Sequence, residues 1–226
     1  MQEGSRGLQS KKRYLLAFLI GTLVFILGFS VTYAVSLAEF QRISNLQGET
    51  SYQIFSDKIL HSFFNKDICT ESSFRKISQD LRFQGVIIDD LEKKLGKNNP
   101  QVLFRKKFYT LIELEHLEFV TERNKQCNES TNTILFLYSN AEEESVKSED
   151  AGRLLDTLYL RNSNLVIYSF DVNLESDLIE QLIKKYEVET IPFLVINEDV
   201  RLVEFENISE IEKYLSEPLK EDVIRL

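Results

Sequence analysis

The sequence predicts an α/β protein in which a membrane-spanning helix and a helical hairpin precede a C-terminal domain of the order β-α-β-α-β-β-α. Three observations support this prediction. An uncharged apolar run covers residues 14–36, apolar-striped helical segments fill residues 37–130, and short strand-like runs alternate with helical patterns over residues 131–216. A basic tail at residues 1–13 and a C-terminal tail at residues 217–226 complete the chain.

The run Tyr14–Ser36 contains no charged residue and no proline. About twenty such residues, at 1.5 Å of helix rise each, cross the ~30 Å hydrocarbon core of a bilayer. The basic residues before the run favour a cytoplasmic N-terminus, so the rest of the chain is expected on the extracytoplasmic side. The alternative is a cleaved signal peptide ending near Ala34-Val-Ser36, but the apolar cores of signal peptides are usually only about 7–15 residues long. We therefore expect a retained single-pass signal anchor.

The formal net charge of the chain is −9, although its first 13 residues are basic. The part expected to be exported is therefore acidic. This acidity argues against nucleic acid or anionic lipid as a partner of that part, and solubility is a sufficient explanation for it.

Three helices are predicted between the anchor and the C-terminal domain. The first, Leu37–Lys66, is either continuous with the anchor or broken near Gly48, and its predicted apolar stripe comprises Tyr52, Phe55, Ile59 and Phe63. A cap at Ser72 or Ser73 begins the second helix, and Gly96 stops it. The third runs from Pro100 to about Lys125, and a short turn makes these last two helices an antiparallel hairpin. The predicted apolar faces comprise Phe74, Ile77, Leu81, Ile88, Leu91 and Leu95 in the second helix and Phe104, Phe108, Leu111, Leu114, Leu117 and Val120 in the third.

Cys69 and Cys127 are the two cysteines of the chain, and each lies 29 residues from Asn98 in the predicted hairpin turn. Two antiparallel helices of nearly equal length bring these positions together at the open end of the hairpin. Because the exported side is usually oxidising, we expect a disulfide that clasps the hairpin. The alternative is two unrelated buried thiols.

The C-terminal domain reads as four strands and three helices. The predicted strands are Thr133–Tyr138, Leu165–Phe170, Phe193–Ile196 and Arg201–Phe205, and the predicted helices are Glu149–Arg161, Ser176–Tyr186 and Ser209–Leu215.

This order, together with the segment Tyr186-Glu-Val-Glu-Thr-Ile191-Pro192-Phe193, resembles the thioredoxin superfamily from Thr131 to about Ser216. The resemblance implies that Pro192 is cis and that Ile191 before it faces a Cys-x-x-Cys pair at the start of the first core helix. It also implies that the backbone beside the proline pairs with extended peptides.

The chain departs from the family at the cysteines themselves. In the best alignment Ser145 and Ser148 occupy the two positions, as Ser-Val-Lys-Ser, and no residue from Asn128 to Leu226 is a cysteine. A hydroxyl cannot form a disulfide, and Glu142–Glu144 would disfavour a thiolate. We therefore expect a degenerate redox motif in which a serine caps the helix.

Other candidate chemistry is sparse. His116 could meet Glu113 on one face of a helix, but no further metal ligands occur at matching spacing, so a solvent-exposed helix face is the simpler interpretation. We expect no metal and no cofactor.

Two functions remain open. The first is a redox-inactive pseudo-enzyme that acts as a binding, chaperone-like or assembly module, with a protein or peptide partner at the Pro192 loop and a helical region that could also mediate homo-oligomers. The second is a thiol-disulfide oxidoreductase-related protein that uses Cys69 and Cys127. The spacing of these two cysteines favours the first.

Overall fold

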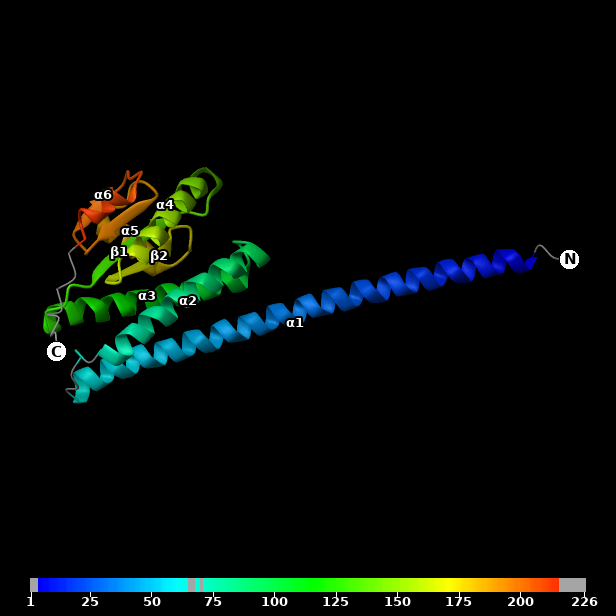
Figure 1. Cartoon of the computed structure of the whole chain (residues 1–226), viewed down its shortest axis with the longest axis horizontal. Coiled ribbons are helices and arrows are strands. Elements are labelled where there is room, and N and C mark those ends of the chain that lie inside the picture. The colour runs from blue at the N-terminus through cyan, green and yellow to red at the C-terminus, as the bar shows by residue number, and fades with distance from the viewer. Residues whose placement is uncertain (1–3, 65–67, 70, 216–226) are drawn as a thin grey trace, which may run out of the picture. The chain divides into compact units, whose positions relative to one another are not determined.

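The computed structural model describes residues 4–64, 68–69 and 71–215 (Figure 1). The predicted C-terminal tail at 217–226 lies outside the described residues. The chain divides into two units, Met1–Asn45 and Leu46–Leu226, which are described separately.

The first unit consists of the N-terminal part of helix α1, which spans Gly4–Phe64. Among the described helices it is the one long and apolar enough to cross a membrane, and the mean hydropathy of its most apolar window is 2.4. The hydroxyls of Thr22, Ser30 and Thr32 each donate to the carbonyl four residues earlier, at 2.8–3.0 Å. Each hydroxyl thus has a hydrogen-bond partner within its own helix, which a polar group needs in the hydrocarbon core of a membrane. The helix continues through Gly48, so the predicted alternative of a break there is wrong.

The second unit begins with the C-terminal part of α1 and the helical hairpin of α2 (Glu71–Leu95) and α3 (Pro100–Cys127). Gly96 ends α2 with φ +92°, a conformation that favours glycine, and the Asn99 side chain caps α3 by accepting from the N–H of Gln101 at 2.9 Å. The predicted hairpin is confirmed. Cys69 and Cys127 form a disulfide with Cα atoms 5.5 Å apart, which confirms the predicted clasp.

The rest of the unit is a mixed four-stranded sheet of order β2-β1-β3-β4 with helices. Strands β1 (Asn132–Tyr138) and β2 (Leu165–Asp171) are parallel, whereas β3 (Phe193–Ile196) is antiparallel to β1 and to β4 (Val200–Leu202). The helices are α4 (Glu142–Arg161), α5 (Asp177–Tyr186) and α6 (Ile208–Glu212). The predicted order of elements is confirmed. Helix α4 begins earlier than predicted, at three glutamates that suit a helix N-terminus, and β4 ends earlier, at Leu202.

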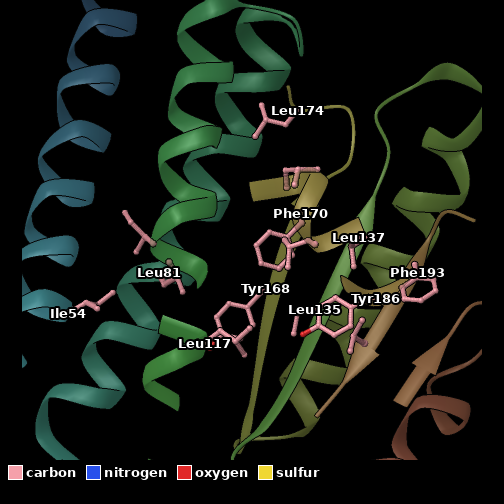
Figure 2. Packing of buried hydrophobic residues seen from close by; sticks show 14 of the residues in the cluster. Ile54, Leu81, Leu117, Leu135, Leu137, Tyr168, Phe170, Leu174, Tyr186 and Phe193 are labelled. Carbon is pink, nitrogen blue, oxygen red and sulfur yellow. The ribbon is translucent and has the colours of Figure 1, made fainter. Parts of the chain in front are cut away.

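Hydrophobic residues pack on both faces of the sheet. One face, with Leu135, Leu137, Tyr168 and Phe170, packs against α5 and the helical region, including Leu81, Leu117 and Ile54 (Figure 2). The other face packs against α4 and α6. That second cluster comprises Ile134, Phe136, Leu194, Ile196, Ala151, Leu155, Leu158 and Ile211, among others.

Two predicted apolar stripes are wrong in part. Tyr52 and Phe55 of α1 are exposed, and Ile54 is the buried residue of that turn. Phe104 and Leu111 of α3 are also exposed. The reason is that polar residues occupy much of the buried surface: Gln84 of α2 donates to Thr50 at 2.7 Å, and several ionisable side chains of α3 are buried.

Candidate functional site

A cleft of about 400 Å³ lies between the hairpin, α4 and the carboxyl ends of β1 and β2. This volume falls in the range of small-ligand sites, about 300–1,000 Å³. The carboxyl ends of neighbouring parallel strands are also where ligands bind in many α/β folds. The apolar residues that line the cleft include Val86, Ile88, Tyr109, Phe136, Leu155 and Ile167.

The strand-to-helix loop at one end of the cleft is held by polar contacts. The Asn173 side-chain oxygen accepts from the Ser139 hydroxyl at 2.9 Å and from the Asn140 N–H at 2.7 Å. The hydroxyl of Ser148, in the second turn of α4, accepts from the Ser139 N–H at 3.1 Å. The loop therefore presents the Asn140 side chain to the neighbouring acidic residues in a fixed position.

A buried ion cluster lies in the cleft next to this loop. Lys106 of α3 is 5% exposed and forms ion pairs with Asp171 at the end of β2 and with Glu92 of α2, the latter at 2.6 Å. The Asn140 amide donates to Asp171 at 2.8 Å and to Glu92 at 3.4 Å. The cluster joins α2, α3, β2 and the loop after β1, and it holds two carboxylates against one ammonium group.

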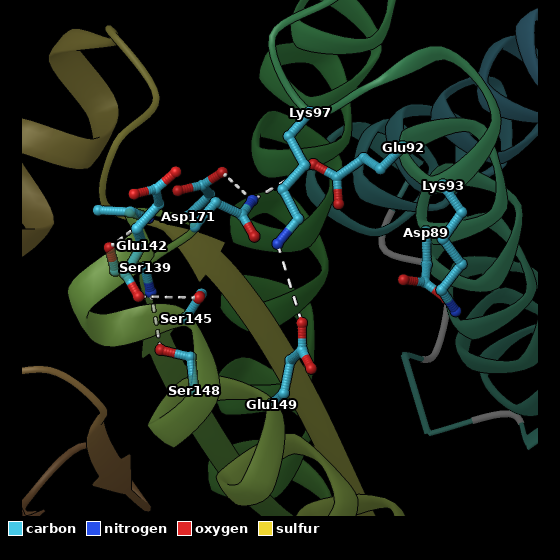
Figure 3. A network of polar contacts seen from close by, with 12 residues as sticks. Asp89, Glu92, Lys93, Lys97, Ser139, Glu142, Ser145, Ser148, Glu149 and Asp171 are labelled. Atoms are coloured by element: carbon cyan, nitrogen blue, oxygen red, sulfur yellow. Dashed lines mark hydrogen bonds and ion pairs between the residues drawn. The ribbon is translucent and has the colours of Figure 1, made fainter.

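The remaining charges that line the cleft are paired at its rim. Arg82 pairs with Asp156 at 3.5 Å, Lys97 with Glu149 at 3.9 Å, and Lys93 with Asp89 at 2.5 Å. Figure 3 shows the Lys97–Glu149 pair reaching from the hairpin turn to α4, with Glu92 and Asp171 in the same view. These side chains are exposed, so each rim pair contributes at most about 1 kcal/mol.

Helix α3 runs along β2, an edge strand of the sheet. Polar side chains of α3 form hydrogen bonds with groups of that strand. Glu113 accepts from the Ser169 N–H at 2.7 Å, and Nδ1 of His116 bonds with the Tyr168 hydroxyl at 2.8 Å. On its outer side, an edge strand has N–H groups that no neighbouring strand pairs with. When such an N–H is buried, a side-chain acceptor gives it the hydrogen-bond partner it would otherwise lack.

Glu113 and His116 are fully buried, so the prediction of a solvent-exposed face at these residues is wrong. Burial raises the pKa of Glu113 well above its usual range and lowers the pKa of His116 to about 3. His116 is therefore expected to be uncharged near neutral pH, and burial favours the uncharged form of Glu113 as well. Nε2 of His116 also contacts the Ser78 hydroxyl at 3.1 Å, which fixes the ring between α2 and β2.

The predicted redox residues lie within α4 and not at its start. The helix begins at Glu142 after Ala141, which makes no side-chain cap, so the expected serine cap is wrong. Ser145 donates to the Glu142 carbonyl at 3.3 Å. Ser148 is buried and lines the cleft, so one of the two predicted positions belongs to the candidate site.

The peptide bond Ile191-Pro192 is cis, as predicted. Ile191 packs against the cluster on the α3 and α5 face of the sheet, and β3 begins at the next residue after the proline. Ile191 and Pro192 are not among the residues that line the cleft, so the structure does not bring the proline loop and Ser148 into one cavity.

The disulfide lies at the other end of the hairpin. Arg123, 1% exposed, donates to the Ile68 carbonyl at 2.7 Å and pairs with Glu129, so it supports the chain on both sides of the clasp. Cys127 is about 30 Å along α3 from Lys106.

Sequence reasoning missed the ion cluster and the cleft. The available signal was the spacing of Lys106, Thr110 and Glu113, which places three polar residues on one side of α3. Within the described part of the chain, no group of three or more His, Cys, Asp or Glu side chains is arranged to hold a metal ion.

No model of a known protein family matches the sequence. No curated protein matches it either.

Proposed function

We propose that the chain is a single-pass membrane protein whose redox-inactive, thioredoxin-like domain acts as a binding, chaperone-like or assembly module on the extracytoplasmic side. Support for the anchor comes from the uncharged run Tyr14–Ser36 within the long helix α1 and from the basic residues before that run. The order of strands and helices and the cis bond at Pro192 support the thioredoxin-like relationship.

The cleft between the hairpin and the sheet carries the proposal of a binding function. It has the volume of a ligand site, and it combines apolar side chains with a buried charged cluster at one end and charged residues at its rim. Catalysis by a serine requires an adjacent base, and the hydroxyl of Ser148 instead accepts from a backbone N–H.

The position of the disulfide favours binding over the redox alternative. Cys69 and Cys127 join the two ends of the hairpin, and their loop spans 58 residues. In the chain-entropy model such a bridge contributes about 4 kcal/mol to stability. We infer that it braces the hairpin wall of the cleft and does not cycle.

The proline loop is proposed as a second contact for the same partner. The backbone of Ile191 has no backbone hydrogen bond with any residue that the structure describes, so an extended peptide could pair with it. A chaperone-like module would then hold a partner segment at this loop and a side chain in the cleft.

Site-specific photocrosslinking in the native membrane tests this function. A photoreactive residue at Val86, on the rim of the cleft, should give a discrete protein adduct, whereas one at Leu160, which is exposed on α4 outside the cleft, should not. Gly152→Leu should abolish the Val86 adduct because Gly152 lines the cleft, and Gly152→Ala is the matched control that leaves most of the volume open. Equal adducts at both positions would contradict a binding role for the cleft.

The redox alternative is tested with Cys69→Ser/Cys127→Ser. We expect this variant to keep the Val86 adduct at a temperature below its unfolding transition, with stability lowered by about 4 kcal/mol. Reductase or oxidase activity in the unmodified protein that disappears in this variant would establish the redox function instead.

A further inference from the structure

The charges that line the cleft do not balance, and the imbalance is confined to its buried cluster. Five carboxylates and four basic side chains line the cleft. At the rim, three basic side chains each pair with one carboxylate: Arg82 with Asp156, Lys93 with Asp89 and Lys97 with Glu149. What remains is Lys106 between Glu92 and Asp171, with side chains 5–9% exposed. One negative charge is therefore left without a cation in a setting where burying charge is costly.

Hydrogen-bond acceptors in this cluster are also unused. Oε1 of Glu92 accepts from Lys106 and Asn140, whereas its Oε2 has no hydrogen-bond partner among the described residues. Thr110, one helical turn from Lys106 and 3% exposed, lines the cleft, and its hydroxyl likewise has no hydrogen-bond partner within the described chain. Neither atom is among the fully buried unpartnered side-chain atoms of the described residues, so both atoms reach the cleft, where a ligand can donate to them.

We propose that the cleft binds an alkylammonium group. Its charge neutralises the Glu92–Lys106–Asp171 cluster, its N–H groups donate to Oε2 of Glu92 and to the Thr110 hydroxyl, and its alkyl stem packs on the apolar lining. This inference rests on the proposed function, because it names the chemistry that the same cleft recognises.

The sign of the surplus charge selects a cation over other ligands. A carboxylate or phosphate would add a second negative charge beside Glu92 and Asp171. A neutral alcohol could donate to Glu92 but would leave the negative charge without a counter-ion. An ammonium supplies both the charge and up to three donors.

The alkylammonium could come from a lysine side chain of a partner protein or from a free amine. The two sources share this chemistry, and they differ in whether a peptide backbone accompanies the amine. Nα-acetyl-lysine N-methylamide, which keeps the free ε-ammonium group, and n-pentylamine therefore serve as the two probes.

Isothermal titration calorimetry of the full chain in detergent at neutral pH tests the proposal. We expect n-pentylamine to bind at least about tenfold more tightly than 1-pentanol, and pentanoate not to bind, because a hydrogen bond between charged groups is stronger than one to a neutral hydroxyl. A higher affinity for Nα-acetyl-lysine N-methylamide than for n-pentylamine identifies a partner lysine as the source, and the reverse order identifies a free amine.

Glu92→Gln should lower the affinity for the amine at least about tenfold, since it removes the surplus charge and keeps the side-chain shape. Glu149→Gln makes the same change at the rim and should alter affinity less than about twofold. Thr110→Val removes the hydroxyl without charge and should lower affinity about two- to tenfold, which provides an independent test if Glu92→Gln unfolds. Equal affinities for the amine and the alcohol, or unchanged amine binding in both Glu92→Gln and Thr110→Val, would overturn the proposal.

The two proposals fail separately. A Val86 photocrosslink without amine binding would overturn the alkylammonium assignment and leave the binding module in place. Amine binding without a photocrosslink would support the ligand chemistry and contradict the protein-binding function.

Discussion

Helices α3 and α4 both pack on the sheet, but they do so with different chemistry. Helix α4 lies on one face and buries Ala151, Leu155 and Leu158 against apolar strand residues. Helix α3 runs beside the edge strand β2 and, besides the apolar packing of Leu117, contacts it through the polar side chains Lys106, Glu113 and His116. A sheet face requires apolar cover, whereas a sheet edge has N–H groups and strand ends that need polar partners. The edge contact is thus the part of the fold that also forms the charged end of the cleft.

The largest expected effect on stability comes from removing the buried positive charge of Lys106 in α3. Lys106→Met keeps an unbranched side chain one atom shorter but leaves Glu92 and Asp171 buried together without a cation, and should lower the free energy of unfolding by about 3–5 kcal/mol. Leu155→Met, a volume-conserving change on α4, should cost less than about 1.5 kcal/mol. Chemical denaturation of both variants measures the difference, and equal losses would mean that the two helices are held in the same way.

The second prediction concerns the pH dependence of stability that arises from the two buried ionisable groups of α3, His116 and Glu113. Because the pKa of His116 is lowered to about 3 in the folded state, the unfolded chain binds a proton that the folded chain does not between about pH 6.5 and pH 3. Stability from His116 is therefore present above the unfolded pKa and is lost as the pH falls, by up to about 1.4 kcal/mol per pH unit. His116→Gln should remove this slope.

Glu113 should act in the opposite direction. Its raised pKa means that the folded state holds a proton that the unfolded state has released, so stability falls as the pH rises above the unfolded value of about 4.5. Glu113→Gln should gain stability relative to the unmodified protein as the pH rises above about 4.5. Urea unfolding at several pH values separates the two slopes, and slopes of the same sign would be inconsistent with two buried uncharged groups.

A third prediction compares two glycines that line the cleft. A Cβ on Gly85 of α2 would lie 2.9 Å from the Tyr109 hydroxyl, which donates to the Leu81 carbonyl. Gly85→Ala should therefore destabilise by about 1–3 kcal/mol, and Tyr109→Phe should restore part of the loss. At Gly152 of α4 the added Cβ meets Phe136 at 3.9 Å, an ordinary contact, so Gly152→Ala should stabilise by up to about 1 kcal/mol. Thermal unfolding tests the opposite signs.

The smallest effect is expected at the rim of the cleft. Lys97→Met breaks an exposed pair with Glu149 and should change the free energy of unfolding by less than about 1 kcal/mol, against the several kcal/mol expected at Lys106. A loss comparable to that of Lys106→Met would show that the rim, and not the buried cluster, holds the hairpin against α4.

Sequence patterns predicted α4 and the strands because apolar residues at regular spacing mark surfaces that pack on a sheet face. They predicted the clasp at Cys69 and Cys127 because helix length fixes where the ends of a hairpin meet. They failed at Glu113 and His116, since a charged residue on a helix usually faces water and the local sequence does not show that α3 lies along a strand edge. The ion cluster was missed for the same reason: Glu92, Lys106 and Asp171 come from three elements that meet only in the folded chain.

The free energy of unfolding of Glu92→Gln is the most direct test of whether the cluster carries a surplus negative charge. Removing a surplus carboxylate leaves a neutral Lys106–Asp171 pair, so the variant should be as stable as the unmodified protein or more stable, by about 0–2 kcal/mol. Glu149→Gln serves as the matched rim control. A loss of about 3 kcal/mol or more in Glu92→Gln alone would mean that Glu92 is a required partner of Lys106, and would contradict both the surplus charge and the ligand inferred from it.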